Sequence, residues 1–149
     1  MEHTLGREFY FSDEIFAREK ERIFCREWFC AGREEELPAA GDYLVVEVAG
    51  ESILVVRTRE GTLAAHYNVC RHRGSRLVLE GSRGSLGGTI RCPYHSWTYT
   101  LDGALRTAPH LDEDEGFTRT SLGLHPVGIE SWGGFFFVNL TPAEASSRN

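Results

Sequence analysis

Long apolar runs are missing from this sequence. No segment approaches the roughly 18 consecutive apolar residues that a membrane-spanning helix needs. The first residues, MEHTLGREFYF, also lack the basic stretch followed by an apolar segment that is typical of a secretory signal. We therefore expect a soluble, cytoplasmic protein with no membrane partner.

An excess of positive charge is missing too. The 149-residue chain, a length that fits one domain, has 16 Lys and Arg against 22 Asp and Glu and a formal net charge of −6. Its basic residues are scattered among acids, whereas nucleic-acid binding usually rests on a basic patch or stripe. The charge pattern therefore argues against a nucleic-acid partner.

Cysteine is scarce, with four in the chain. Cys25 and Cys30 lie among aromatic residues without a nearby histidine, and we predict that both are buried free thiols, since free Cys is among the most buried residue types. Cys70 and Cys92 each lie within three residues of a histidine. In a cytosolic chain, such Cys-His pairs favour metal binding over disulfides.

The residue pattern predicts one helix followed by short antiparallel strands. Apolar residues recur at helical spacing over 12–26, with Ser12 or Asp13 as the N-cap. Three runs rich in β-branched residues within 43–69 predict three consecutive strands. A short strand at 89–91, a tight hairpin around Gly103, and two further strands on either side of Gly133 and Gly134 complete the prediction.

The fold class is therefore mainly β, a small antiparallel β domain preceded by one N-terminal α-helix. We divide the chain into an N-terminal segment with the amphipathic helix (1–36), the β domain (37–140) and a polar tail or linker (141–149). The acidic segment APHLDEDEGF is predicted to be a solvated loop.

Two short stretches carry the chemistry: CRHRG (70–74) and CPYHSW (92–97). Together they offer two thiols and two imidazoles, enough for a closed tetrahedral zinc site. Zinc sites usually pair Cys with Cys and His with His, however, whereas each stretch here is mixed. A Rieske 2Fe-2S cluster has two thiolates on one iron and two imidazoles on the other, so two loops that each supply one of each suit it directly.

CRHRG and CPYHSWTYTLDGAL resemble the two cluster-binding loops of Rieske proteins. The form with Arg71, Arg73, Tyr94 and Trp97 is similar to the N-terminal domain of α subunits of Rieske non-haem iron oxygenases, the ring-hydroxylating type. The flanking segments, IFAREKERIFCREWFCAG before the strands and WGGFFFVNL at the end, are similar as well. The resemblance therefore covers nearly the whole chain and implies that 37–140 is a Rieske 2Fe-2S domain.

The resemblance assigns a role to most residues of the two stretches. It implies that the ligands are Cys70 and Cys92 on one iron and His72 and His95 on the other. It also implies that four more residues surround the cluster: Arg73, Gly74, Tyr94 and Trp97.

Several positions separate this chain from respiratory-chain Rieske proteins. Those proteins have an extra cysteine in each loop, where this chain has Ser75 and Tyr94, so no bracing disulfide can form. They also have a serine that donates to a cluster sulfur where this chain has Trp97, which predicts a potential near the low end of the Rieske range, about −150 mV. Tyr99 matches a tyrosine that donates to a cysteine ligand, and Ser96 stands where glycine is usual.

An oxygenase also needs a mononuclear iron held by two histidines and a carboxylate. The family pattern, Asp-x-x-His followed by a His five residues on, is missing from this sequence. We therefore expect one-electron transfer from a reductase or ferredoxin to the iron of an oxygenase catalytic domain, a dioxygenase or monooxygenase, with no catalytic residue in this chain. The family's ring-shaped oligomers imply a homo-oligomer. The alternatives are a freestanding Rieske ferredoxin and a zinc-stabilised interaction module.

Overall fold

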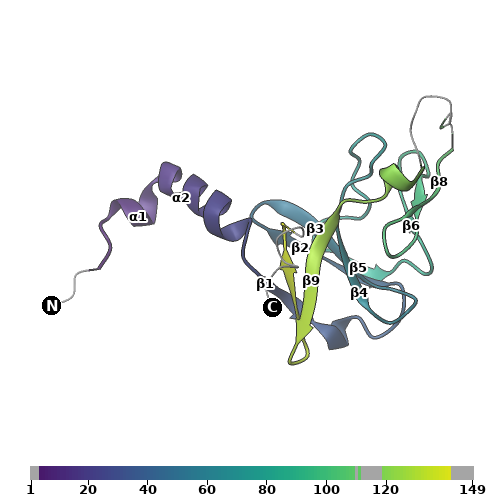
Figure 1. Cartoon of the computed structure of the whole chain (residues 1–149), viewed down its shortest axis with the longest axis horizontal. Helices are drawn as coiled ribbons and strands as arrows, with labels where there is room; N and C mark the ends of the chain where they lie inside the picture. Colours follow the sequence, from purple (N-terminus) through teal and green to yellow (C-terminus); the bar gives the residue numbers. More distant parts are fainter. Residues whose placement is uncertain (1–3, 110, 112–118, 142–149) are drawn as a thin grey trace.

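The computed structural model describes residues 4–109, 111 and 119–141, and these form two antiparallel sheets. The larger sheet has seven strands in the order β1-β10-β9-β4-β3-β2-β5, and the smaller has the order β6-β7-β8 (Figure 1). The mainly β prediction is confirmed. The strands are β1 Phe29–Arg33, β2 Asp42–Val48, β3 Glu51–Arg57, β4 Leu63–Tyr67, β5 Arg83–Ser85, β6 Ile90–Arg91, β7 Thr98–Tyr99, β8 Leu105–Thr107, β9 Pro126–Trp132 and β10 Phe135–Asn139.

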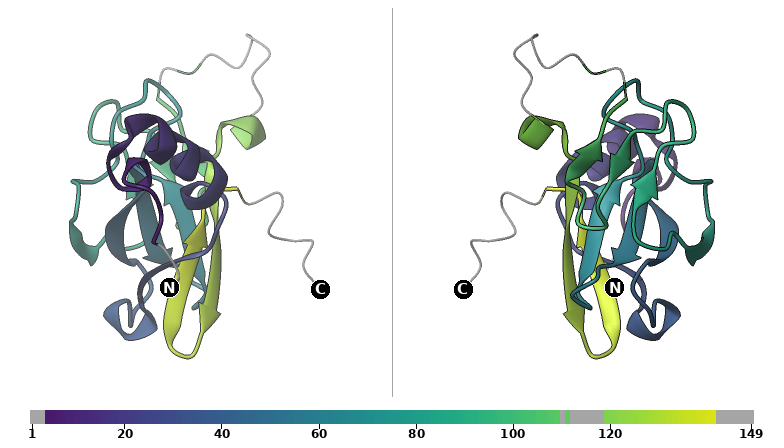
Figure 2. Two further views of the ribbon diagram at one scale, coloured as in Figure 1. Left: turned by 90° about the vertical axis from the view of Figure 1, so that its left-hand side faces the viewer. Right: turned by 90° about the vertical axis from the view of Figure 1, so that its right-hand side faces the viewer.

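The N-terminal helical segment is built in three pieces: α1 (Glu8–Phe11), α2 (Asp13–Glu19) and a π-helical turn (Lys20–Phe24). Ser12 caps α2 as predicted, because its Oγ accepts a hydrogen bond from the Ile15 amide at 3.3 Å. None of these pieces contains a buried residue. The segment lies at the opposite end of the molecule from the small sheet, and Figure 2 shows each end in turn. No helix in the described part of the chain is long and apolar enough to cross a membrane.

Strand β3 forms the centre of the core. The three strands predicted within 43–69 are β2, β3 and β4, paired in register as antiparallel neighbours. Ile53, Leu54, Val55 and Val56 are all fully buried, so β3 has no polar face. The reason is that each face meets a different core, since alternate side chains of a strand point to opposite sides.

The two cores have different contents. One face of β3 packs Leu54 and Val56 into a cluster that also contains both cysteines of the CRHRG and CPYHSW stretches. The other face packs Ile53 and Val55 against Phe136 and other residues of the large sheet. The large sheet is therefore covered on one side by the segment that carries the candidate site.

The later hairpins also agree with the sequence patterns. The strand predicted at 89–91 is β6. Gly103, with a φ of +92°, lies in the turn that joins β7 to β8, and Gly133 and Gly134 join β9 to β10. The predicted acidic loop (108–117) and polar tail lie largely outside the described residues.

Two strands were not predicted, and one of them changes the interpretation of a cysteine. Strand β1 lies at the edge of the large sheet, and the Cys30 side chain within it is exposed, whereas its neighbours Phe29 and Ala31 are half-buried. Cys25 is only half-buried. The prediction that both are buried thiols is therefore wrong, although both are free thiols. The second missed strand, β5, has three residues and lies at the opposite edge.

Gly103, in the turn of the small sheet, lies tightly against His66 of β4. A Cβ on Gly103 would lie 2.5 Å from Cε1 of the buried His66, whose Nε2 hydrogen-bonds the Leu101 carbonyl at 3.1 Å. We expect Gly103→Ala to lower the free energy of unfolding by roughly 2–4 kcal/mol, from left-handed strain and overpacking together.

The matched control for this substitution is Gly61→Ala. Gly61 has a φ of +84°, but a Cβ there would meet no atom within 4 Å, so only the backbone strain applies. Its expected cost is about 1 kcal/mol by urea denaturation. Equal costs at both positions would show that the His66 contact is not tight.

Candidate metal centre

The two Cys-His stretches form loops with the same backbone hydrogen bonds. In the first loop the Cys70 amide donates to the Ser75 carbonyl at 2.8 Å and the Gly74 amide donates to the Cys70 carbonyl at 3.0 Å. In the second loop the Cys92 amide donates to Trp97 at 2.8 Å and the Ser96 amide to Cys92 at 3.1 Å. Each loop therefore closes on its own cysteine.

The fifth residue of each loop has a left-handed backbone. Gly74 has a φ of +68° and Ser96 a φ of +60°. Glycine adopts this conformation without strain, which gives a physical reason for Gly74 in the first loop. Ser96, at the corresponding position of the second loop, has a side chain in a backbone conformation that favours glycine.

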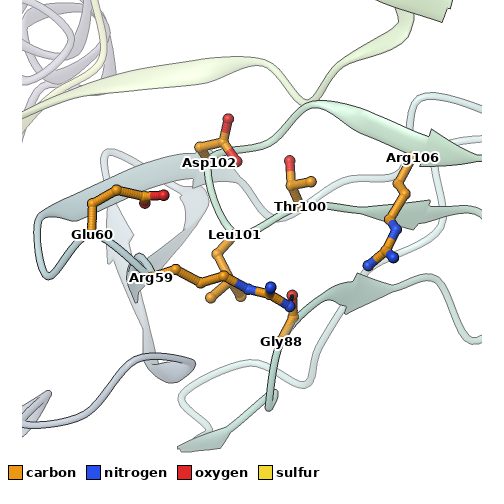
Figure 3. Close-up of a pocket in the computed structure, with 7 residues that line it drawn as sticks. All are labelled: Arg59, Glu60, Gly88, Thr100, Leu101, Asp102 and Arg106. Atoms are coloured by element: carbon orange, nitrogen blue, oxygen red, sulfur yellow. Dashed lines mark hydrogen bonds between the residues drawn. The ribbon is translucent and has the colours of Figure 1, made fainter.

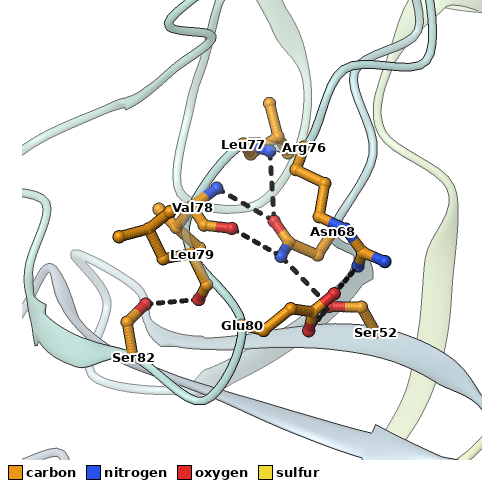
Figure 4. Close-up of polar contacts among 8 residues, drawn as sticks. All are labelled: Ser52, Asn68, Arg76, Leu77, Val78, Leu79, Glu80 and Ser82. Carbon is orange, nitrogen blue, oxygen red and sulfur yellow. Dashed lines mark hydrogen bonds and ion pairs between the residues drawn. The ribbon is translucent and has the colours of Figure 1, made fainter.

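Asn68 anchors the first loop and was not singled out from the sequence (Figure 4). Its buried side chain donates to Ser52 Oγ at 3.1 Å and to the Val78 carbonyl at 2.9 Å. Its Oδ1 accepts from the amides of Leu77 and Val78 at 3.2 and 3.1 Å. Because Asn68 lies two residues before Cys70, this network fixes both the start of the loop and the segment that follows it.

The two cysteines are buried together. Cys70 is 3% exposed and Cys92 is 2% exposed, and both belong to the core on one face of β3. Burial raises the pKa of the Cys70 thiol, while the hydrogen bond from Tyr99 opposes that rise. A metal bound here has to hold the sulfurs as thiolates against that burial.

Tyr99 is the polar partner of the sulfurs. Its hydroxyl lies 3.2 Å from Cys70 Sγ and accepts a hydrogen bond from the Arg71 amide at 3.2 Å. Because the hydroxyl oxygen already accepts from the amide, its proton is available for donation to sulfur. Burial and then this contact with Cys70 raise the pKa of Tyr99, so it remains protonated.

The two histidines lie beside one another at the surface end of the loops. The ring centroids of His72 and His95 are 4.8 Å apart, with the rings edge to face. Trp97 stacks under His72 with centroids at 4.8 Å and planes within 11°, and Tyr94 lies over His95 at 3.8 Å. Partial desolvation, then the neighbouring His95 and Arg73, lower the pKa of His72, which favours the neutral imidazole that ligates metal.

The structure therefore brings the four candidate ligands together as two pairs, the buried Cys70 and Cys92 sulfurs and the adjacent His72 and His95 rings. No three Cys, His, Asp or Glu side chains in the described part of the chain gather closely enough to hold one ion. The donor set instead forms two pairs, as a cluster with two sulfur-bound and two nitrogen-bound positions requires. The residues present fit a Rieske cluster.

The four residues predicted to surround the cluster all lie in or beside the two loops. Gly74, Tyr94 and Trp97 shape the loops as described above, and Arg73 is exposed beside His72. One contact was missed: the Arg71 guanidinium meets His125 Nε2. Burial, then the Arg71 charge, lower the pKa of His125. A contact between residues 54 positions apart leaves no signal in the local sequence.

A separate hollow of about 340 Å³ has none of the four candidate ligands in its lining (Figure 3). It is lined by both signs of charge, Arg59 and Arg106 together with Glu60 and Asp102. It offers neither a thiol nor an imidazole, so it is not the metal centre. Its lining is Arg59, Glu60, Gly88, Thr100, Leu101, Asp102 and Arg106.

Fold and site together define a Rieske-type domain, and comparison with known families agrees. Residues 27–129 match the model of the Rieske [2Fe-2S] domain, more than half of the chain. The chain belongs to this family, and its cofactor is a Rieske-type 2Fe-2S cluster. The family therefore excludes the zinc-stabilised module considered from the sequence.

The relatives that the chain matches are oxygenase subunits. It is 41% identical over 137 residues to a carnitine monooxygenase oxygenase subunit of Acinetobacter baumannii, covering 92% of this chain and 36% of that protein. It is 45% identical over 139 residues to a glycine betaine monooxygenase oxygenase subunit of Chromohalobacter salexigens, covering 93% and 31%. The chain thus spans about a third of the length of these relatives.

Solved structures show the same relationship. The apo form of the quaternary ammonium Rieske monooxygenase CntA superposes with a TM-score of 0.88 at 40% identity, covering 93% of this chain and 40% of that one. A naphthalene 1,2-dioxygenase with indole bound gives a TM-score of 0.77 at 32% identity, covering 86% and 29%. The predicted resemblance to Rieske non-haem iron oxygenases is confirmed.

Tyr99→Phe tests the hydrogen bond to sulfur. A donor to a thiolate stabilises the reduced, more negative cluster, so its loss should lower the midpoint potential. We expect a fall on the order of 60 mV, which corresponds to about 1.4 kcal/mol for one electron. Tyr43→Phe is the control, because its hydroxyl bonds Ser82 and not a cysteine. An unchanged potential in Tyr99→Phe would contradict the assigned donation.

Proposed function

We propose that this chain is the electron-transfer domain of a Rieske oxygenase subunit. Cys70 and Cys92 hold one iron of the cluster and His72 and His95 hold the other. The observation that carries the ligand assignment is the sorting of the site by ligand type: both sulfurs are buried in the core, and the two imidazoles lie edge to face at the surface end. When bound, the cluster supplies a site that accepts and releases one electron.

The residues around the cluster have different roles. The core on one face of β3 keeps water from the sulfurs, and Tyr99 donates to Cys70. Trp97 stacks on His72 and holds its ring orientation. Because His72 is exposed, its ring offers the shortest path for an electron between the buried site and a docked partner.

The partners follow from the multi-component character of the relatives. A reductase or ferredoxin delivers the electron, and the mononuclear iron of an oxygenase catalytic domain receives it. No two of the six histidines in the sequence have the spacing expected of that second iron site, so the acceptor residues come from outside these 149 residues. The subunits assemble as a homo-oligomer in the cytoplasm, where Cys25 and Cys30, which are not proposed ligands, stay reduced.

The oxygenase that this domain serves acts on a small quaternary ammonium compound. Identity to carnitine and glycine betaine monooxygenase subunits is 41% and 45%, against 32% to naphthalene dioxygenase. The match also extends into the N-terminal helical segment, since it covers 92% of the chain. Their exposed Phe9, Phe16 and Ile23, between 47% and 55% exposed, favour a domain of a larger oxygenase over a freestanding ferredoxin.

Substitution of the proposed ligands tests the assignment. Anaerobically purified protein should contain about two irons per chain and, after dithionite reduction, give a rhombic Rieske EPR signal. Cys70→Ser and His95→Ala should each lose the signal and most of the iron. Cys30→Ser and His125→Ala, which change an exposed cysteine and histidine that are not proposed ligands, should keep both. Loss of iron in the controls alone would overturn the ligand set.

Reduction by a protein donor tests the electron-transfer role. Under anaerobic conditions, the reductase serving the Acinetobacter baumannii carnitine monooxygenase, supplied with its reductant, should bleach the cluster's visible absorption. Omission of the reductase is the control. The same mixture in air should form no product from carnitine or glycine betaine, because this chain has no oxygen-activating site. A cluster that only dithionite can reduce would contradict the proposed partner.

A further inference from the structure

Ser96 is one of two non-glycine residues with a positive φ in the described part of the chain, the other being Ala49. Its backbone matches that of Gly74 in the first loop, where the same two hydrogen bonds close the turn. Glycine meets that backbone demand without strain, and serine does not. A side chain at a strained position next to a functional site suggests a role for that side chain.

The Ser96 side chain makes one described bond that explains its presence. Its Oγ accepts a hydrogen bond from the Arg91 guanidinium at 2.9 Å. Arg91 directly precedes Cys92, and Ser96 directly follows His95. The bond therefore joins the two ends of the second loop and encloses both of its proposed ligands.

The bond to Ser96 does not neutralise the positive charge of Arg91, because the hydroxyl is uncharged. The surrounding sequence does not offset it: 70–79 and 89–101 together contain no Asp or Glu, in a chain of net charge −6. The guanidinium is exposed, so without a tether it would sample many positions in solvent. The bond to Ser96 confines it to the edge of the ligand loop.

We propose that Ser96 is a positioning residue that holds the Arg91 guanidinium beside the cluster, and that this tethered charge raises the cluster's reduction potential. Reduction adds one negative charge to the cluster, and a nearby positive charge stabilises the reduced form. The inference rests on the ligand assignment proposed above. It adds a residue that tunes the potential without binding the cluster.

Three variants separate the contributions of the Ser96 hydroxyl, the backbone strain and the Arg91 charge. Ser96→Gly removes the hydroxyl and suits the left-handed backbone, so the loop still folds. Ser96→Ala removes the hydroxyl and keeps the strain. Arg91→Gln removes the charge but can still donate to Ser96. We expect a lower midpoint potential than the parent in all three, with the iron content and the EPR signal retained.

The matched control is Arg106→Gln, an exposed arginine of the same small sheet that lines the hollow of Figure 3. It should leave the potential unchanged. The difference between the parent and Arg91→Gln should also shrink as salt is raised, since exposed charges are screened. Thermal unfolding of each variant, measured in parallel, identifies any shift that comes from a damaged fold.

The outcomes are distinct. Parent-like potentials in both Ser96 variants overturn the proposal, because the hydroxyl then positions nothing that the cluster senses. A parent-like potential in Arg91→Gln overturns it as well, because the charge is then not the cause. A parent protein without iron or EPR signal leaves no potential to measure and refutes the ligand assignment instead.

Discussion

The sulfurs of this site must stay dry while the imidazoles stay at the surface, and the rest of the molecule is arranged around that requirement. Burial of both faces of β3 makes it possible. The face that carries Leu54 and Val56 packs in the core that contains Cys70 and Cys92. The opposite face packs in the second core, with other residues of the large sheet. A strand with one solvated face would provide one core or the other, but not both.

Polar groups are placed sparingly inside this core. The Tyr99 hydroxyl reaches one sulfur from below, while Asn68 satisfies four backbone and side-chain groups at the base of the first loop. Each of these side chains is buried and each has a hydrogen-bond partner, as low exposure requires. Tyr99 thus serves a sulfur, and Asn68 serves the amides that follow the first loop.

The sequence predicts the site better than its surroundings. The four candidate ligands lie within two short stretches, so their spacing is visible without any knowledge of the fold. The cap at Ser12 and the central hairpins are local too, and the structure confirms them. Cys30 shows the limit, because its exposure depends on the side of β1 to which it points, and β1 forms only by pairing with residues more than a hundred positions away.

Asn68 and Ser96 show why other features escape a sequence pattern. A lone asparagine becomes an anchor only when Ser52 and Val78 are brought to it by the fold. The strain at Ser96 becomes visible only when its φ is known, although the sequence already showed serine in place of the usual glycine. Both effects depend on backbone geometry and not on residue type alone.

The matching closure of the two loops has a consequence for cofactor assembly. Each loop is closed by amide-carbonyl bonds within six residues of its own cysteine. Closure by the chain's own backbone limits the positions that the ligands can sample, which lowers the entropic cost of binding a cofactor between them. The two loops contribute alike to this effect, because each is held by the same pair of bonds to its own cysteine.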